Sequence, residues 1–224
     1  MTHALPSLTR DSLDHAIRIL AERDPLMSSL LRQFGMPPMW QRSQNFSTLV
    51  HIVLEQKVSL ASARAVMQRV QELCPGMSAE LFLQVSEQAL RDAGISARKV
   101  SYCRSIAMAL HGGELDLKRL RQRSDEEVMR QLTAIRGIGP WTAGVYLLMA
   151  MRRPDAWASG DRALAVSLAE CEELETVPSY ADLDQRASGW QPYRAAAARL
   201  LWHAYLSRRQ PRGRVRSRVV GERG

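Results

Sequence analysis

Apolar residues recur along most of the chain at intervals of three and four positions. This spacing gathers them on one face of an α-helix. It predicts nine helices, at residues 11–22, 25–34, 46–55, 59–73, 97–110, 125–135, 141–151, 162–170 and 192–207. Ser124 precedes an acidic turn, and Ser78 and Ser96 are of a residue type that caps helices. Because stretches of alternating, β-branched residues are scarce, we expect an all-α fold.

Length and hydrophobic content bound how this helical chain is organised. With 224 residues, 46% of them hydrophobic, the chain can bury a core as one large domain or as two small lobes. The longest apolar run, residues 143–151, is too short to cross a bilayer, and the N-terminus lacks the pattern of a secretory signal. We therefore expect a cytoplasmic protein without a membrane segment.

Positive charge is concentrated at the C-terminal end. The formal net charge is +8, and the segment from Arg208 onward, RRQPRGRVRSRVVGERG, contributes +6 through seven arginines and one glutamate. We predict that residues 207–224 form a disordered tail, whose arginines add a salt-dependent attraction to phosphate. The rest of the chain is nearly balanced, so charge alone supports a nucleic-acid partner only weakly.

One stretch, LTAIRGIGPWTAG at residues 132–144, combines two glycines with the start of a helix. We expect the helix at 125–135, a tight turn at 136–139 and a second helix opened by Pro140. The glycines leave the backbone bare, and the second helix points free N–H groups and its positive dipole end outward. Such a turn can seat an anion, most naturally a phosphate. A Gly-x-Gly pair by itself is also compatible with an ordinary helix cap.

The segment LTAIRGIGPWTA resembles the helix-hairpin-helix of the HhH-GPD DNA glycosylase superfamily, which is named for this hairpin and for a following Gly/Pro-rich loop with an aspartate. The loop is present as PDAWASGDRAL, with Asp161 twenty residues after Trp141. LEQKVSLASARAV, GISARKVSYCRSIA and GWQPYRAAAARLLW resemble segments of the alkylpurine branch, 3-methyladenine DNA glycosylase II. The resemblance spans residues 24–206. It implies one unit over residues 1–206, made of two helical lobes with the active-site cleft between them and the hairpin motif at about 125–151.

Asp161 is the candidate catalytic residue. Cleavage of an N-glycosidic bond builds oxocarbenium character on the sugar, so a fixed carboxylate near the anomeric carbon stabilises the transition state more than the ground state. Asp161 also follows Ser159 and Gly160 at the start of a predicted helix, which makes an N-cap the alternative interpretation. The two roles are compatible.

An enzyme of this kind extrudes the damaged nucleotide and holds its base in a pocket. Aromatic faces suit a positively charged, alkylated purine through stacking and cation–π attraction. The resemblance assigns this pocket to Trp141 and Trp202. Core packing is the alternative for any tryptophan at helical spacing. It is our interpretation of Trp40, Trp157 and Trp190, with a position at the cleft as a second alternative for Trp40.

Trp141 also bears on the reaction type. Lyase-competent relatives place a lysine at this position, whose amine forms a Schiff base with the sugar. With tryptophan there, we expect a monofunctional enzyme in which water is the nucleophile and an abasic site is the product. Only one cysteine, Cys171, follows Asp161, so we expect no iron–sulfur cluster. The spacing of Cys74, Cys103 and Cys171 fits neither a disulfide framework nor a metal knuckle, and we expect reduced, buried thiols.

The resemblance also implies residues that contact DNA. In the minor-groove segment Lys57 departs from the pattern, because family members place an apolar or uncharged residue there as a wedge for the gap left by the flipped base. Arg98 and Lys99 are candidates for backbone phosphates, with a solvated helix face as the alternative. The full set of implied DNA contacts is Gln56, Lys57, Ser59, Arg98, Lys99, Gly137, Ile138, Gly139 and Thr142.

We expect no divalent metal site, because the five histidines form no ligand pair. The family's hairpin often holds Na⁺ or K⁺ through backbone carbonyls, which would be those of Thr133, Ile135 and Ile138. No other cofactor is expected.

The sequence thus predicts a monomeric DNA glycosylase that hydrolyses 3-methyladenine-type lesions from double-stranded DNA in base excision repair. A glycosylase for uracil or mismatched bases is one alternative. A non-catalytic binder of damaged DNA is another, and Asp161 in its proper register argues against it.

Overall fold

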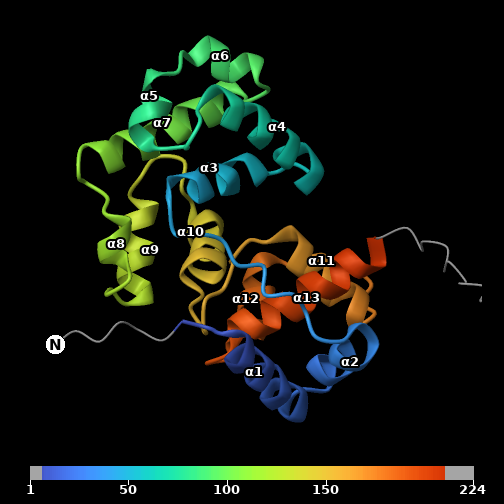
Figure 1. The fold of residues 1–224 in the computed structure, drawn as a ribbon. Coiled ribbons are helices and arrows are strands. Elements are labelled where there is room, and N and C mark those ends of the chain that lie inside the picture. Colours follow the sequence, from blue (N-terminus) through green and yellow to red (C-terminus); the bar gives the residue numbers. More distant parts are fainter. Residues whose placement is uncertain (1–6, 210–224) are drawn as a thin grey trace, which may run out of the picture.

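The structure, a computed structural model, describes residues 7–209. Within these residues every element of regular secondary structure is a helix, which confirms the predicted all-α class (Figure 1). The elements are α1 (Arg10–Arg23), α2 (Pro25–Phe34), α3 (Phe46–Glu55), α4 (Leu60–Leu73), α5 (Ala79–Gln84), α6 (Glu87–Asp92), α7 (Ala97–His111), α8 (Leu117–Leu120), α9 (Asp125–Thr133), α10 (Pro140–Tyr146), the π-helix η1 (Leu147–Met151), α11 (Arg162–Cys171), α12 (Tyr180–Ser188) and α13 (Arg194–Arg209).

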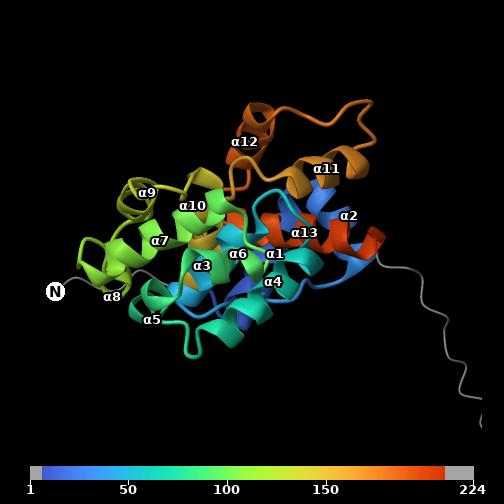
Figure 2. The same cartoon turned by 90° about the horizontal axis from the view of Figure 1, so that it is seen from above.

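The helices form two groups joined by α10. In the first, which we call the α7 lobe, α7 packs against α3, α5 and α6, and α4 packs against α3 and α6. In the second, the α13 lobe, α13 contacts α1, α2, α11 and α12. Helix α10 contacts α3 and α9 and lies between the two groups (Figure 1). Seen from above, the α7 lobe partly overlies the α13 lobe (Figure 2). The chain enters the α13 lobe, builds the α7 lobe and then returns, so α10 to α13 close the fold.

Polar caps define where most helices begin. The side chains of Ser78, Ser96 and Ser124 each accept a backbone N–H bond at the start of α5, α7 and α9, as the sequence predicts. The sequence pattern did not predict α5, α6, α8 and α12, which have nine residues or fewer. Helices of this length are stabilised mainly by tertiary packing rather than by local periodicity.

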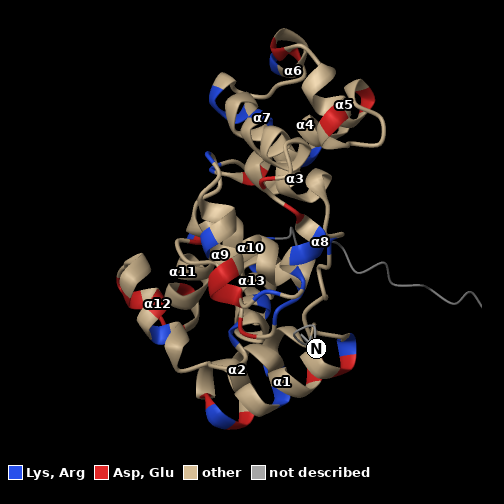
Figure 3. Ribbon diagram, turned by 90° about the vertical axis from the view of Figure 1, so that its left-hand side faces the viewer, with Lys and Arg blue, Asp and Glu red and all other residues tan. Residues whose placement is uncertain are grey.

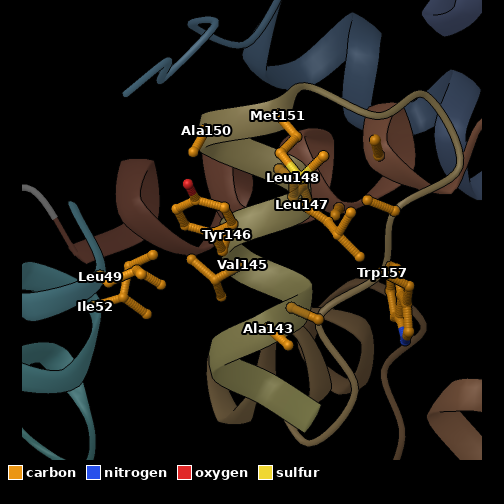
Figure 4. Close-up of a cluster of buried hydrophobic side chains, with 14 of the residues drawn as sticks. Leu49, Ile52, Ala143, Val145, Tyr146, Leu147, Leu148, Ala150, Met151 and Trp157 are labelled. Carbon is orange, nitrogen blue, oxygen red and sulfur yellow. The ribbon is translucent and has the colours of Figure 1, made fainter. Parts of the chain in front are cut away.

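The predicted helix 141–151 is two structures in succession. It begins as α10 and continues as the π-helix η1, which ends where Arg152 adopts a left-handed conformation with φ 56°. Tyr146, at the junction, and Val145 are both buried. Their side chains face Leu49 and Ile52 of α3 (Figure 4). The widened turn was not predictable from a spacing of three and four, because a π-helix follows a different hydrogen-bond step.

Arg199 of α13 is fully buried, and its hydrogen bonds connect α13 with η1 and with the segment before α3. Its guanidinium donates to Met39 O at 3.1 Å, Ala195 O at 3.0 Å and Leu148 O at 2.7 Å. Burial lowers the pKa of Arg199 to about 10. The carbonyl of Leu148 belongs to η1, so this arginine supplies a donor where the π-helix changes the regular pairing.

The remaining tryptophans occupy the places expected for packing. Trp157 and Trp190 are buried, which confirms the core interpretation, and Trp40 is half-buried with its ring edge against His203. Basic and acidic residues are interspersed over the helices in the view of Figure 3. No helix of the described residues has the length and apolar character needed to cross a membrane.

Helix α13 extends farther than predicted. It runs to Arg209, so residues 207–209 are helical and not part of a disordered tail. Arg208 and Arg209 pair with Glu170 of α11 at 3.4 and 2.5 Å, which fixes the last turn. The remainder of the predicted tail, 210–224, lies outside the described residues.

The cysteines provide a direct test of the core. Cys74 and Cys103 are buried, and burial raises the pKa of both thiols, that of Cys103 to about 12. Cys171 is half-buried, which corrects the expectation that all three thiols are buried.

We expect a thiol reagent such as DTNB to label Cys171 in the native protein and the other two only on unfolding, because the thiolate is the reactive form. Cys171→Ser should abolish native labelling; rapid reaction of a second thiol would contradict the packing.

Candidate functional site

The carboxylate of Asp161 is the point on which the predicted catalytic and pocket residues converge. Trp141 Nε1 donates to Asp161 Oδ2 at 2.7 Å, and Trp202 Nε1 donates to Oδ1 at 3.3 Å. Oδ1 also accepts from the backbone N–H of Leu164 at 2.9 Å, which makes Asp161 the N-cap of α11. The three residues that the sequence singles out therefore meet, and the cap interpretation is confirmed.

Each of these side chains comes from a different helix. Trp141 lies in the first turn of α10, Asp161 caps α11, and Trp202 lies in the middle of α13. Asp161 is 7% exposed and Trp202 is 8% exposed, whereas Trp141 is half-buried. All three donors to the carboxylate are neutral N–H groups. They orient the negative charge at a helix N-terminus without neutralising it by a cation.

The loop that carries Asp161 is fixed from two sides. On one side, Asp184 of α12 accepts from Trp157 Nε1 at 2.8 Å and from the hydroxyl of Ser159. On the other, the loop backbone lies against Gly144 of α10, where a Cβ atom would come within 2.3 Å of Trp157 O. Sequence reasoning missed Asp184, because nothing in its local pattern indicates a partner 25 residues earlier in the chain.

The hairpin between α9 and α10 has the predicted turn. Gly137 has φ 97°, and a Cβ atom there would lie 2.3 Å from Tyr102 Cβ of α7. Gly139 is different: it has an ordinary φ of −93°, caps α10 without a side-chain bond, and a Cβ atom there would meet nothing within 4 Å. The fold therefore requires glycine at 137, and it leaves space at 139.

Gln56 ties the loop after α3 to this hairpin. Its Nε2 donates to Gly137 O at 3.0 Å and to Thr142 Oγ1 at 2.9 Å. Thr142 is only 1% exposed and Ile138 only 3%. The side chains of these two predicted DNA-contact residues therefore lie inside the hairpin, whereas Gly137 and Gly139 are partly exposed.

The loop from Lys57 to Leu60, the first residue of α4, directly follows Gln56. Lys57 is exposed in a left-handed conformation with φ 57°, and Ser59 caps α4 by accepting from Ser62 N at 3.1 Å. Val58 and Leu60, on either side of Ser59, are 47% and 49% exposed. The chain therefore presents two apolar side chains next to the lysine that departs from the family pattern.

Lys99 and Arg98 occupy different environments. The ammonium of Lys99 donates to Leu54 O at 2.7 Å and to Gln56 O at 2.9 Å, so it caps the C-terminal end of α3, and burial lowers its pKa. The alternative of a solvated face is therefore wrong for Lys99. Arg98 is exposed, hydrogen-bonds to the Tyr102 hydroxyl, and lies 5.5 Å from the centre of that ring.

The hairpin backbone offers oxygen ligands of the kind a monovalent cation uses. Thr133 ends α9, so its carbonyl is among those without a partner inside the helix. The carbonyl of Ile135 accepts from Ile138 N at 3.1 Å, which leaves one of its lone pairs free. These carbonyls fit the predicted ion chemically. Within the described residues, no cluster of three histidine, cysteine or acidic side chains is arranged to hold a metal ion.

Comparison with known proteins gives the same family as the hairpin and the aspartate loop. The profile of the HhH-GPD superfamily of base excision DNA repair proteins matches residues 50–192. A relative from Schizosaccharomyces pombe, DNA-3-methyladenine glycosylase 1, is 26% identical over 72% of this chain and 73% of its own length. The chain spans 65% of the length of a Bacillus subtilis relative.

Two solved structures are also similar. The S. pombe 3-methyladenine DNA glycosylase in complex with abasic DNA has a TM-score of 0.77 and 24% identity, over 84% of this chain and 95% of that one. A DNA-3-methyladenine glycosidase from Bacillus halodurans has a TM-score of 0.70 and 29% identity, over 85% and 88%.

The contrast between the two hairpin glycines predicts opposite effects on stability. Gly137→Ala should lower the free energy of unfolding by about 1–3 kcal/mol, because it adds both strain at a positive φ and a clash with Tyr102. Gly139→Ala should change it by less than about 1 kcal/mol, the scale of an altered N-cap. Urea denaturation measures both. Equal losses would show that the turn is not shaped as described.

Proposed function

The chain belongs to the HhH-GPD superfamily of base excision DNA repair proteins, and from this premise we propose that it is a monofunctional DNA glycosylase acting on alkylated bases of the 3-methyladenine type. The observation that carries the proposal is the Asp161 carboxylate, held at 2.7 and 3.3 Å by the indoles of Trp141 and Trp202. A buried, oriented carboxylate between two aromatic rings suits a reaction that develops positive charge on a flipped nucleotide.

Asp161 would act on the sugar and the tryptophans on the base. As the glycosidic bond breaks, the carboxylate stabilises the oxocarbenium character at the anomeric carbon. An alkylated purine already carries positive charge and is a good leaving group, so it needs little acid catalysis. The indole N–H groups fix the ring edges of Trp141 and Trp202 on Asp161, and their faces are the surfaces proposed for the base.

Water is the proposed nucleophile. Trp141 stands where an amine would be required for Schiff-base chemistry. Its nitrogen donates to Asp161 and has no basic lone pair with which to attack the sugar. The product is then an abasic site and a free base, without strand cleavage. The cytoplasmic location, the monomeric state and the lack of an iron–sulfur cluster stay predictions.

The hairpin and the loop from Lys57 to Leu60 would bind the DNA backbone. Gly139 leaves the backbone bare at the start of α10, where N–H groups favour a phosphate, whereas Gly137 packs against Tyr102. A Na⁺ or K⁺ held by the carbonyls of Thr133, Ile135 and Ile138 would add positive charge there. Lys57, Ser59 and Arg98 lie at the surface for further contacts.

Asp161→Asn tests the proposed chemistry. Asparagine keeps the N-cap while removing the negative charge, so we expect release of methylated bases from alkylated duplex DNA to fall about 100-fold or more in single-turnover assays. DNA affinity, followed in parallel, should be largely retained. Asp182→Asn, at an exposed position of α12, is the matched control and should leave release unchanged.

Two results would contradict this scheme. Undiminished release by Asp161→Asn would remove Asp161 from the chemistry. A wild-type protein that binds DNA but releases no methylated base would exclude the alkylpurine substrate and direct the search to uracil, mismatched bases or a binding role.

We expect the residues of the loop from Lys57 to Leu60 to have two separate roles in base flipping. Val58 and Leu60 supply the apolar surface that fills a gap in the base stack, whereas Lys57 adds charge. The double change Val58→Ser and Leu60→Ser should reduce the fluorescence rise of 2-aminopurine placed beside the lesion. Lys57→Ala should instead weaken DNA binding and reduce the slope of log K against log salt concentration by about 1, the value for one lost phosphate contact. Leu73→Ser and Leu81→Ser, at apolar residues each 42% exposed elsewhere, are controls that should do neither.

A further inference from the structure

Lys99 lies in the first turn of α7, a place that disfavours a cation on its own helix. Ser96 caps α7, so the side chain of Lys99 starts near the positive end of that helix dipole. The ammonium group instead reaches α3, where Nζ donates to Leu54 O at 2.7 Å and to Gln56 O at 2.9 Å. Lys99 is half-buried, whereas its neighbour Arg98 is exposed. Two adjacent basic residues are thus used differently, since one is directed at backbone carbonyls and the other remains accessible.

The end of α3 depends on this donor. Gln56 is the C-cap, and Lys57 turns the chain at φ 57°, a left-handed value that glycine adopts more readily. Within residues 7–209, the carbonyls of Leu54 and Gln56 accept from no backbone N–H group. Leu54 is 3% exposed, and a carbonyl without a donor is costly in such a place. Lys99 therefore supplies, from another helix, the cap of a turn that has no glycine.

The stretch that Lys99 fixes carries two features proposed to act on DNA. Gln56 joins the hairpin, because its Nε2 donates to Gly137 O at 3.0 Å. The loop from Lys57 to Leu60 follows directly. The Gln56 carbonyl, which accepts from Lys99, stands between these two features in the chain. A shift of that carbonyl would move the loop relative to the hairpin.

The same turn of α7 also supports the hairpin. Tyr102 follows Lys99 by three residues, so the two side chains are neighbours on the helix surface. Gly137 lies so close that a Cβ atom there would come within 2.3 Å of Tyr102 Cβ. Helix α7 therefore contacts the end of α3 through Lys99 and the hairpin through Tyr102, which makes it the common support of both segments.

We propose that Lys99 is a positioning residue for base flipping. By capping α3 it sets the loop from Lys57 to Leu60 against the hairpin, and it does not itself bind a DNA phosphate. Two of its three N–H groups are used inside the protein. Moving the ammonium group to a phosphate would leave both carbonyls without a donor. The inference rests on the proposed function, because it gives Lys99 a part in the extrusion of a damaged nucleotide.

Four variants separate positioning from phosphate binding. Lys99→Met removes the N–H donors but keeps an unbranched side chain, and Lys99→Arg returns donors through the guanidinium fork. Lys57→Met removes the charge for which a phosphate contact is proposed. Lys118→Met, at an exposed lysine of α8, is the matched control.

The first measurement is the affinity for unmodified duplex DNA as a function of salt concentration. We expect Lys99→Met and Lys118→Met to keep the wild-type slope of log K against log salt concentration. Lys57→Met should reduce this slope by about 1. A reduction of about 1 in Lys99→Met would overturn the proposal, because it would make Lys99 a phosphate contact.

The second measurement is single-turnover release of a methylated base that is either paired or placed opposite an abasic position. An unpaired base is easier to extrude, so a misplaced loop matters less there. Lys99→Met should slow release about tenfold from the paired site and less than about threefold from the unpaired one, and Lys99→Arg should restore most of the paired rate. Both rates come from one preparation, so their ratio is independent of the folded fraction. Equal slowing at the two sites would reduce Lys99 to a structural role and contradict the proposal.

Failure of the proposed function would look different. A wild-type protein that releases no methylated base contradicts the alkylpurine substrate. Lys99 is then judged by the salt slope and by the fluorescence of 2-aminopurine beside a stable abasic-site analogue, which reports entry of the loop into the base stack. A fluorescence change that is lost in Lys99→Met at an unchanged slope supports positioning, and a change of wild-type size in this variant overturns it.

Discussion

The hydrogen bonds to the Asp161 carboxylate are the constraint on which the arrangement of the site depends. They join the first turn of α10, the N-terminus of α11 and the middle of α13. The two tryptophan donors, Trp141 and Trp202, are 20 and 41 residues from Asp161 in the sequence. Each helix is held in turn by the core: α10 by Gly144 against the loop of Trp157, and α13 by Arg199. A charged group with little exposure is tolerated here because every bond to it comes from a fixed donor.

Arg199 shows how the fold accommodates an irregular helix close to that site. The π-helix widens the backbone after α10, and the carbonyl of Leu148 takes a donor from α13. The same guanidinium holds Met39 O in the segment before α3. One buried cation therefore fixes the positions of α13, η1 and the segment around Met39 relative to one another. Because Trp202 lies less than one turn from Arg199 on α13, the position of its indole follows from this packing.

The sequence predicted the parts of the structure that depend on local signals. Apolar spacing located the long helices, Ser96 and Ser124 marked helix starts, and the hairpin and aspartate motifs led to Trp141, Asp161 and Trp202, which lie together. It did not predict Asp184 as the support of the aspartate loop or Lys99 as the cap of α3. Both depend on partners distant in the chain, which periodicity and spacing do not encode. Thr142 and Ile138 are implied DNA contacts, and burial of their side chains in the hairpin, which their motif does not encode, leaves that implication a prediction.

The bonds of Gln56 have an evolutionary consequence. Its single amide nitrogen serves a carbonyl on the hairpin and the hydroxyl of Thr142 at once. Glutamate, of nearly the same shape, would bring an acceptor against the Gly137 carbonyl, and leucine would leave that carbonyl without its donor. Selection on Gln56 would therefore preserve the joint between the loop after α3 and the hairpin, independently of any contact that the side chain makes with DNA. Descendants that changed their lesion preference would be expected to vary Lys57 and Val58 long before they varied the glutamine beside them.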